Sequence, residues 1–557
     1  MADENIKGSG GEKEARAREW ADRGVAAVRE DKFDEAIANF NKAIALHPGN
    51  AEAYAGRGYV YGVRGEDDKA IADYSRAIEL SPDDGNAYGL RGNAHYREGE
   101  YDKAIADHDK AIELGRNDPG AYFARGNAYN GKGEHDKAIA DFTRGIELSP
   151  DADFRAYFLR GSMYSCKGDH NRAIADYSRA IDLEPSDVAA YAGRGFVHNL
   201  RKEYDKAIAD FTKAIGLDPD NADLYGARGN AYSERGKHDR AIADYNKAIA
   251  LRSDDFRTHC NRGMSYDGTG NYDMAIASFN RAMALDPENA EIYARRGNTF
   301  FHKGEHSKAL ADYDKATELA PDYAAAYSGR GVLYTKKGEY DRAIENFNRA
   351  VDLDPSARTY VRRASVYYVR GEYDMAIADL DKAIELDPNY GMAYAGRGDT
   401  YARRGECDRA IADFNKLIEL DPEHAGAYFS RGYIYGEQGK YGRAIEDLTR
   451  AIHLGEKDIQ AEAYFRRGNV FEEMGDSEKA KEDSAKAEAM RREPDGQGAK
   501  QGGATRLVIT FAMPFRANKT GAEHRNSDFL FGPAVEDISA DFLQRGSQTA
   551  SGDVRAA

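Results

Sequence analysis

The chain has 557 residues, with 79 Lys and Arg against 96 Asp and Glu, and its formal net charge is −17. An acidic surface disfavours nucleic acids and anionic membranes as partners, because phosphate contacts require clustered Lys and Arg. The sequence has no apolar run of about 18 residues, so it predicts no membrane insertion. Its three cysteines lie far apart without CxxC spacing and indicate reduced thiols rather than a zinc or redox site.

Residues 1–16 form a polar N-terminal lead. The first twenty residues are charged and lack an apolar core, so they do not read as a signal peptide. We therefore expect a cytoplasmic location by default.

Residues 17–494 consist of about fourteen copies of a 34-residue repeat, for which Ala51–Asp84 serves as the reference unit. The units begin at residues 17, 51, 85, 119, 154, 188, 222, 256, 290, 324, 357, 391, 425 and 461. A single unit of this size cannot bury its own apolar face, so neighbouring units must stack into one array. An array of this kind favours binding over catalysis.

Seven residues of the reference unit carry a family resemblance. They are Tyr54, Gly58, Tyr61, Ala70, Tyr74, Ala77 and Pro82, at positions 4, 8, 11, 20, 24, 27 and 32 of the unit. This spacing resembles the tetratricopeptide repeat, a helix–turn–helix unit. The resemblance implies an all-α fold, a right-handed superhelical solenoid of tandem repeats.

Each unit predicts two helices joined by a turn. We expect positions 2 to 14 of a unit to form the first helix, which is Glu52–Arg64 in the reference unit. We expect positions 18 to 31 to form the second helix, which is Asp68–Ser81. Gly65 occupies the turn, and an acid such as Asp68 is expected to cap the second helix. Pro82 marks the end of that helix.

Two charged ladders run through the array. Position 7 is Arg in every unit, from Arg23 to Arg467, and position 23 is Asp in eleven units, beginning with Asp73. Because the two ladders have opposite charge and nearly the same period, we expect them to pair. The alternative is that the arginines form a basic stripe for a ligand.

Two motifs resemble a phosphate-binding or metal-binding site, but the residues of the repeat explain both. Gly126–Gly133 nearly matches a phosphate-binding loop, but its glycines belong to the repeat. His302 and His306 lie on either side of a turn glycine and favour packing over metal binding. We therefore predict no catalytic, cofactor-binding or metal residues, and no enzyme activity.

The family resemblance implies that partners bind in a concave groove lined by the first helices. The most basic patch in that groove combines Arg295, Asn298, Arg358 and Arg362, a candidate site for an acidic segment. Asn93 and Asn127 occupy position 9 in consecutive units and could hold a peptide backbone. Aromatic residues at positions 5 and 9 either line the groove or pack between units: Tyr59, Phe123, Phe158, Phe196, Phe429, Tyr433 and Phe465.

Residues 495–557 form a tail that opens with a flexible linker and contains the apolar segment Arg506–Phe515. Either the tail is disordered, or this segment docks onto the array.

Together these features predict a non-enzymatic scaffold or adaptor that binds extended peptides or helices of other proteins. The alternatives are a self-associating scaffold, which would be a homo-oligomer, and a regulatory or targeting subunit of an enzyme complex.

Overall fold

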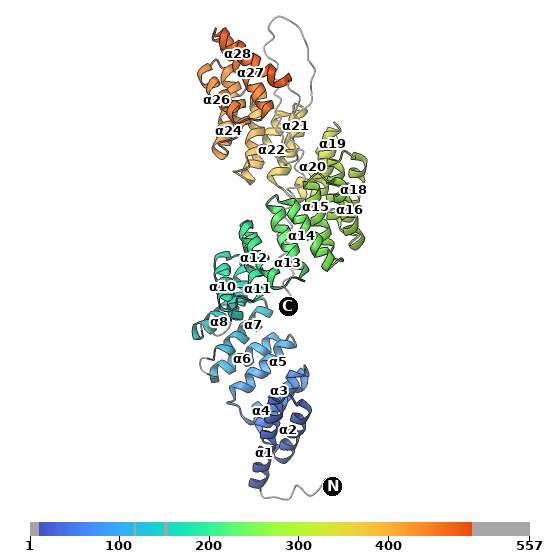
Figure 1. The fold of residues 1–557 in the computed structure, drawn as a ribbon, viewed down its shortest axis with the longest axis vertical. Coiled ribbons are helices and arrows are strands. Elements are labelled where there is room, and N and C mark those ends of the chain that lie inside the picture. Colours follow the sequence, from blue (N-terminus) through green and yellow to red (C-terminus); the bar gives the residue numbers. More distant parts are fainter. Residues whose placement is uncertain (1–9, 116–117, 150–153, 493–557) are drawn as a thin grey trace. The chain divides into compact units, whose positions relative to one another are not determined.

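The computed structural model describes residues 10–115, 118–149 and 154–492, and these residues form 28 α-helices without a β-strand (Figure 1). The chain divides into two compact bodies, residues 1–231 and residues 232–557, with the division inside α13. The all-α prediction is therefore confirmed. The proposed domain limits 1–16, 17–494 and 495–557 stay a prediction, and the tail segment Arg506–Phe515 lies outside the described residues.

Each sequence repeat forms one helix pair. The pairs up to the division are α1 (Gly10–Arg29), α2 (Phe33–Leu46), α3 (Ala51–Val63), α4 (Asp67–Leu80), α5 (Gly85–Arg97), α6 (Tyr101–Gly115), α7 (Pro119–Gly131), α8 (His135–Leu148), α9 (Phe154–Cys166), α10 (His170–Leu183), α11 (Val188–Leu200), α12 (Tyr204–Leu217) and the first helix of the next pair, α13 (Ala222–Glu234).

The remaining helices are α14 (His238–Leu251), α15 (Phe256–Gly268), α16 (Tyr272–Leu285), α17 (Ala290–His302), α18 (His306–Leu319), α19 (Ala324–Lys336), α20 (Tyr340–Leu353), α21 (Ala357–Val369), α22 (Tyr373–Leu386), α23 (Gly391–Arg403), α24 (Cys407–Leu420), α25 (Ala425–Glu437), α26 (Tyr441–Leu454), α27 (Lys457–Glu473) and α28 (Ser477–Arg492). In the reference unit both helices begin one residue earlier than predicted.

Side-chain caps lie mainly on the first helices, which corrects the expectation for the second. The Asn50 side chain accepts a hydrogen bond from the Ala53 amide at the start of α3, whereas the N-cap of α4, Glu66, makes no such bond. Acids at position 18 lie inside the first turn, and at least six of them pair with a basic residue of the next unit, as Asp102 does with Lys132 at 2.7 Å. These acids therefore link neighbouring units.

The turn between the helices of a unit requires left-handed backbone. Twelve turn glycines have positive φ, for example Gly65 at 71°. Asp31 and Lys202 occupy the same turn position in their units with φ of 55° and 60°. Because a Cβ is strained in this region, these two turns store strain that the glycine turns do not.

The two helices of a unit pack a small residue against a large one. A Cβ added to Gly297 would lie 2.9 Å from Cε1 of the buried Tyr313 on α18. The unit that carries Ala364 at this position has Leu380 in place of the aromatic residue. Glycine at position 8 is therefore needed where position 24 is aromatic.

The first helices of most successive units contact one another. These contacts join α3 to α5 and α5 to α7 in the first body, and α17 to α19 and α21 to α23 in the second. Among the described helices, no two consecutive second helices are in comparable contact. The first helices therefore form the inner layer of each body, and we call positions 9, 12 and 13 of these helices the inner face.

No helix within the described ranges is long and apolar enough to cross a bilayer.

Candidate functional site

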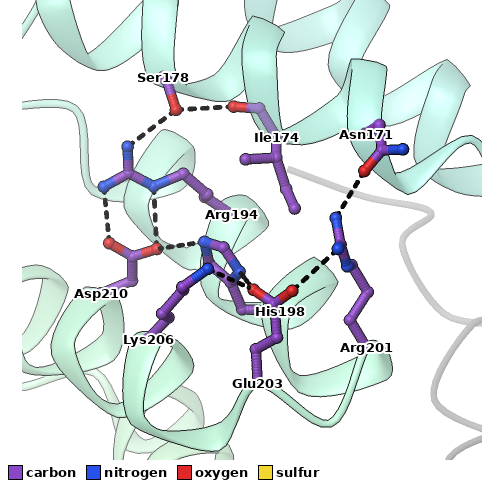
Figure 2. Close-up of polar contacts among 9 residues, drawn as sticks. All are labelled: Asn171, Ile174, Ser178, Arg194, His198, Arg201, Glu203, Lys206 and Asp210. Atoms are coloured by element: carbon purple, nitrogen blue, oxygen red, sulfur yellow. Dashed lines mark hydrogen bonds and ion pairs between the residues drawn. The ribbon is translucent and has the colours of Figure 1, made fainter.

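The arginine ladder pairs with the aspartate ladder, and the pairs that the structure shows lie within a unit rather than between neighbouring units. Figure 2 shows one instance, in which Arg194 donates from Nε and Nη2 to the two carboxylate oxygens of Asp210 at 2.9 and 2.7 Å. Both partners are largely buried, and the same bidentate geometry recurs from Arg57–Asp73 to Arg467–Asp483. Charge-assisted bonds of this geometry hold the two helices of a unit together.

The same arginine also bonds to the preceding unit, which the sequence did not predict. Nη1 of Arg194 donates to Ser178 Oγ on α10 at 3.0 Å (Figure 2). All units from the second onward repeat this bond to position 25 of the preceding unit, where Asn, Ser, Thr or Asp accepts it. The arginines therefore fasten the units to each other.

Two units place a histidine beside this contact. In Figure 2, His198 Nδ1 lies 2.8 Å from Glu203 Oε2, and its Nε2 lies 4.0 Å from Asp210 Oδ2. His95 has the same arrangement with Glu100 and Asp107. Other units carry mainly Tyr or Phe at this position, so histidine here adds ionic contacts to a packing position.

Two of the predicted basic-patch residues lie on α17 and are buried. Arg295 is only 6% exposed and forms an ion pair with Glu291 one turn earlier on the helix. Asn298 is buried too, and its side-chain oxygen accepts a hydrogen bond from Tyr313 at 2.7 Å. Both side chains therefore already have protein partners.

The other two patch residues lie on α21. Arg362 is 1% exposed and donates to Ser328 Oγ on α19 at 2.9 Å, which links two consecutive first helices. Arg358 is half-buried near the start of the same helix. The structure thus places all four residues on first helices of the second body. Their role in peptide binding stays a prediction.

The two predicted asparagines lie on the inner face of the first body. Asn93 on α5 is exposed, and Asn127 on α7 is half-buried. They belong to consecutive first helices that contact each other. Their role in holding a peptide backbone stays a prediction.

Exposed apolar side chains gather on the inner layer of the first body. Among the described residues, the large apolar side chains exposed in this body all lie on first helices: Val25, Tyr59, Val63, Tyr96, Phe196 and Leu200. Tyr59 and Phe196 are 43% and 47% exposed, although Phe196 also packs edge-on against Phe211 at 5.1 Å. Phe196 therefore packs against a neighbouring ring and is still exposed to solvent. Val63 and Leu200 were not predicted from the sequence, although each is an apolar residue one helical turn after an aromatic one.

The remaining motifs have ordinary structural surroundings. His302 at the end of α17 pairs with Asp267 at 2.9 Å, and His306 at the start of α18 packs on Phe301 with ring centroids 5.6 Å apart. In the part of the chain that the structure describes, no three His, Cys, Asp or Glu side chains are placed to hold a metal ion.

Comparison with known families decides the assignment. A model described as TPR repeat matches residues 92–133, 161–200, 229–267, 269–304, 297–338 and 398–439. Models described as tetratricopeptide repeat match residues 21–85, 119–152, 188–221, 211–243, 324–356, 357–390, 425–454 and 461–494. The chain belongs to the tetratricopeptide repeat family. Its repeats identify it as a protein-interaction scaffold.

Several solved structures are similar to this tetratricopeptide repeat chain. Yeast Tom70 is 18% identical, with 84% of this chain and 100% of that chain covered and a TM-score of 0.41. A chain of the APC/C hetero-tetramer Cut9–Hcn1 is 16% identical, with coverage of 82% and 96% and a TM-score of 0.39. YrrB, described as a TPR protein with an unusual peptide-binding site, is 28% identical, with coverage of 35% and 97% and a TM-score of 0.31. No curated protein matches the chain.

Proposed function

We propose that this tetratricopeptide repeat protein captures extended segments of partner proteins along the inner faces of its first helices. The observation that carries the proposal is the exposure of large apolar side chains, such as Tyr59 and Phe196, on that layer of the first body. Exposed apolar side chains gathered on one face are typical of a surface that a partner covers. The first helices hold these side chains on a rigid framework.

The second body supplies the candidate contacts to an acidic segment. Arg295, Asn298, Arg358 and Arg362 lie on α17 and α21, on either side of α19. A guanidinium group binds a carboxylate through two parallel hydrogen bonds, so a ligand carboxylate could replace Glu291 at Arg295. At Arg362 a ligand carboxylate would replace the neutral hydroxyl of Ser328. In the first body, Asn93 and Asn127 would bond to a peptide backbone.

Self-association and a regulatory role in an enzyme complex are the competing functions for the same fold. Self-association predicts a mass above that of one chain in the absence of any partner. A regulatory role predicts a captured partner with catalytic activity. A cytoplasmic location is part of our proposal and can be checked by cell fractionation.

The test compares the full-length chain with two variants in affinity capture from native extract, followed by cross-linking mass spectrometry. One variant carries R295A, N298A, R358A and R362A, and the other carries N93A and N127A. The control, R281A with R349A, removes exposed arginines from the second helices α16 and α20. Partner cross-links that map to the first helices and weaken in one of these two variants, but not in the control, support the proposal. Cross-links confined to α16, α20 and the other second helices contradict it.

A further inference from the structure

The inner face of the first body contains two matching apolar pairs. On α3, Tyr59 and Val63 are 43% and 50% exposed, and on α11, Phe196 and Leu200 are 47% and 44% exposed. In each pair the residues are four apart, so they lie one above the other on the same helix face. Both pairs occupy positions 9 and 13 of their units.

The helices between these pairs present uncharged polar groups. At positions 9 and 12, α5, α7 and α9 carry Asn93, Tyr96, Asn127, Asn130, Ser162 and Ser165. Amide and hydroxyl side chains both donate and accept hydrogen bonds. They can therefore satisfy the backbone N–H and C=O groups of an extended chain whatever its sequence.

Charge is nearly absent from this surface, although the chain as a whole is acidic. On the first helices α3, α5, α7, α9 and α11, the inner face has one charged residue, Arg97. Its Nε donates a hydrogen bond to Asp67 at 3.1 Å. The inner face of the second body differs, because it carries acidic and basic residues at Asp267, Lys336, Arg403, Glu437, Glu472 and Glu473. The two bodies therefore offer surfaces of different chemistry.

We propose that the inner face of α3–α11 binds an uncharged, apolar, extended segment of a partner protein. This inference rests on the proposed function and specifies the chemistry of one ligand. A charged ligand side chain would lose its hydration here without gaining an opposite charge, because the one cation on the surface is already paired. An apolar side chain would gain by covering the pairs on α3 and α11.

The spacing of the helices sets the length of the ligand. Packed helices lie about 8–10 Å apart, so the four steps from α3 to α11 cover roughly 35 Å. An extended chain advances about 3.3 Å per residue, so the ligand would have roughly 10–12 residues. We expect large apolar side chains near both of its ends, with the intervening backbone held by the amide and hydroxyl groups.

The test selects ligands from a phage-displayed library of random peptides, about 12 residues long, on the full-length protein. Enriched peptides are then synthesised with a fluorophore and titrated by fluorescence anisotropy. The inner-face variant is Y59S, V63S, F196S and L200S. Its matched control is M375S with L386S, which removes apolar side chains that are each 51% exposed on the second helix α22. Thermal melts by circular dichroism check that both variants are folded.

We expect uncharged, apolar peptides whose Kd rises at least about tenfold in the inner-face variant, since covering an apolar side chain contributes about 1.5–3 kcal/mol. The control should bind as the wild type does, and raising NaCl from about 0.15 M to about 1 M should not weaken binding.

Two other outcomes would overturn the inference and separate it from the proposed function. Charged peptides that lose binding in the R295A, N298A, R358A and R362A variant would leave groove capture standing but assign it to the second body. Apolar peptides that bind the inner-face variant as tightly as the wild type would place the site elsewhere. If no peptide is enriched on the wild type, groove capture itself fails as well.

Discussion

His108 on α6 gives the sharpest test of how the array is packed. Its side chain is 1% exposed, and neither ring nitrogen has a hydrogen-bond partner. Most other units place Tyr or Phe at this position, for example Tyr74 and Phe142. Burial lowers the pKa of His108 from its ordinary 6.5 to about 4. The imidazole is therefore held neutral in an apolar packing position.

The lowered pKa fixes the direction of the pH dependence. Between pH 6.5 and pH 4 the unfolded chain takes up a proton on His108 that the folded chain does not. Folding stability is therefore fully present above pH 6.5 and is lost as the pH falls towards 4. The complete shift corresponds to about 3 kcal/mol, of which about 2 kcal/mol is lost between pH 8 and pH 5.

We expect H108F to remove this pH dependence. Phenylalanine reproduces the packing of Phe142 and leaves no unsatisfied nitrogen, so the variant should also gain about 1 kcal/mol near neutral pH. Because repeat arrays do not unfold in one step, the assay is hydrogen exchange of the α5 and α6 amides, corrected for intrinsic rates, at about pH 8 and about pH 5. The α19 and α20 amides in the second body, whose helices contain no histidine, are the internal control.

The expected result is a fall in local stability of α5 and α6 that is about 2 kcal/mol larger in the wild type than in H108F. The reasoning is refuted if the two proteins lose the same stability on acidification, since His108 would then titrate normally. A fall of equal size in α19 and α20 would also refute a local origin.

Three further substitutions test the framework. K202G should stabilise its unit by about 1 kcal/mol, because φ at Lys202 is 60° and glycine adopts this without strain. Hydrogen exchange of the α11 and α12 amides measures the change, and faster exchange in the variant would contradict this. G297A should lower the stability of its unit by about 1–3 kcal/mol, because the new methyl group overpacks against Tyr313. Adding Y313L should restore most of that stability, and additive losses of stability in the double-mutant cycle would argue against a clash. R397A should cost about 2–4 kcal/mol, because it leaves the buried carboxylate of Asp413 unpaired. Hydrogen exchange of the α23 and α24 amides measures the loss, and a loss below about 1 kcal/mol would show that the contact is dispensable.

The sequence predicted the framework because each of its requirements fixes a residue type. In most units glycine faces an aromatic residue between the helices and Arg faces Asp, so both patterns recur with the period of the repeat. The contact between units escaped prediction because its acceptor is Ser at 178, Asp at 109 and Asn at 415, which share only the ability to accept a hydrogen bond. Because several residue types can accept this hydrogen bond, no single residue type recurs at the position.

The solvent exposure of inner-face side chains could not be predicted from residue identity either. Asn93 and Asn298 are the same residue at the same repeat position, yet the first is exposed and the second is buried and bonded to Tyr313. Which state an inner-face residue adopts depends on the neighbouring side chains rather than on its own identity. The repeat period therefore sets the backbone, while the variable inner positions set the chemistry. Because those positions differ between the two bodies, one array of nearly identical units can offer partners two different surfaces.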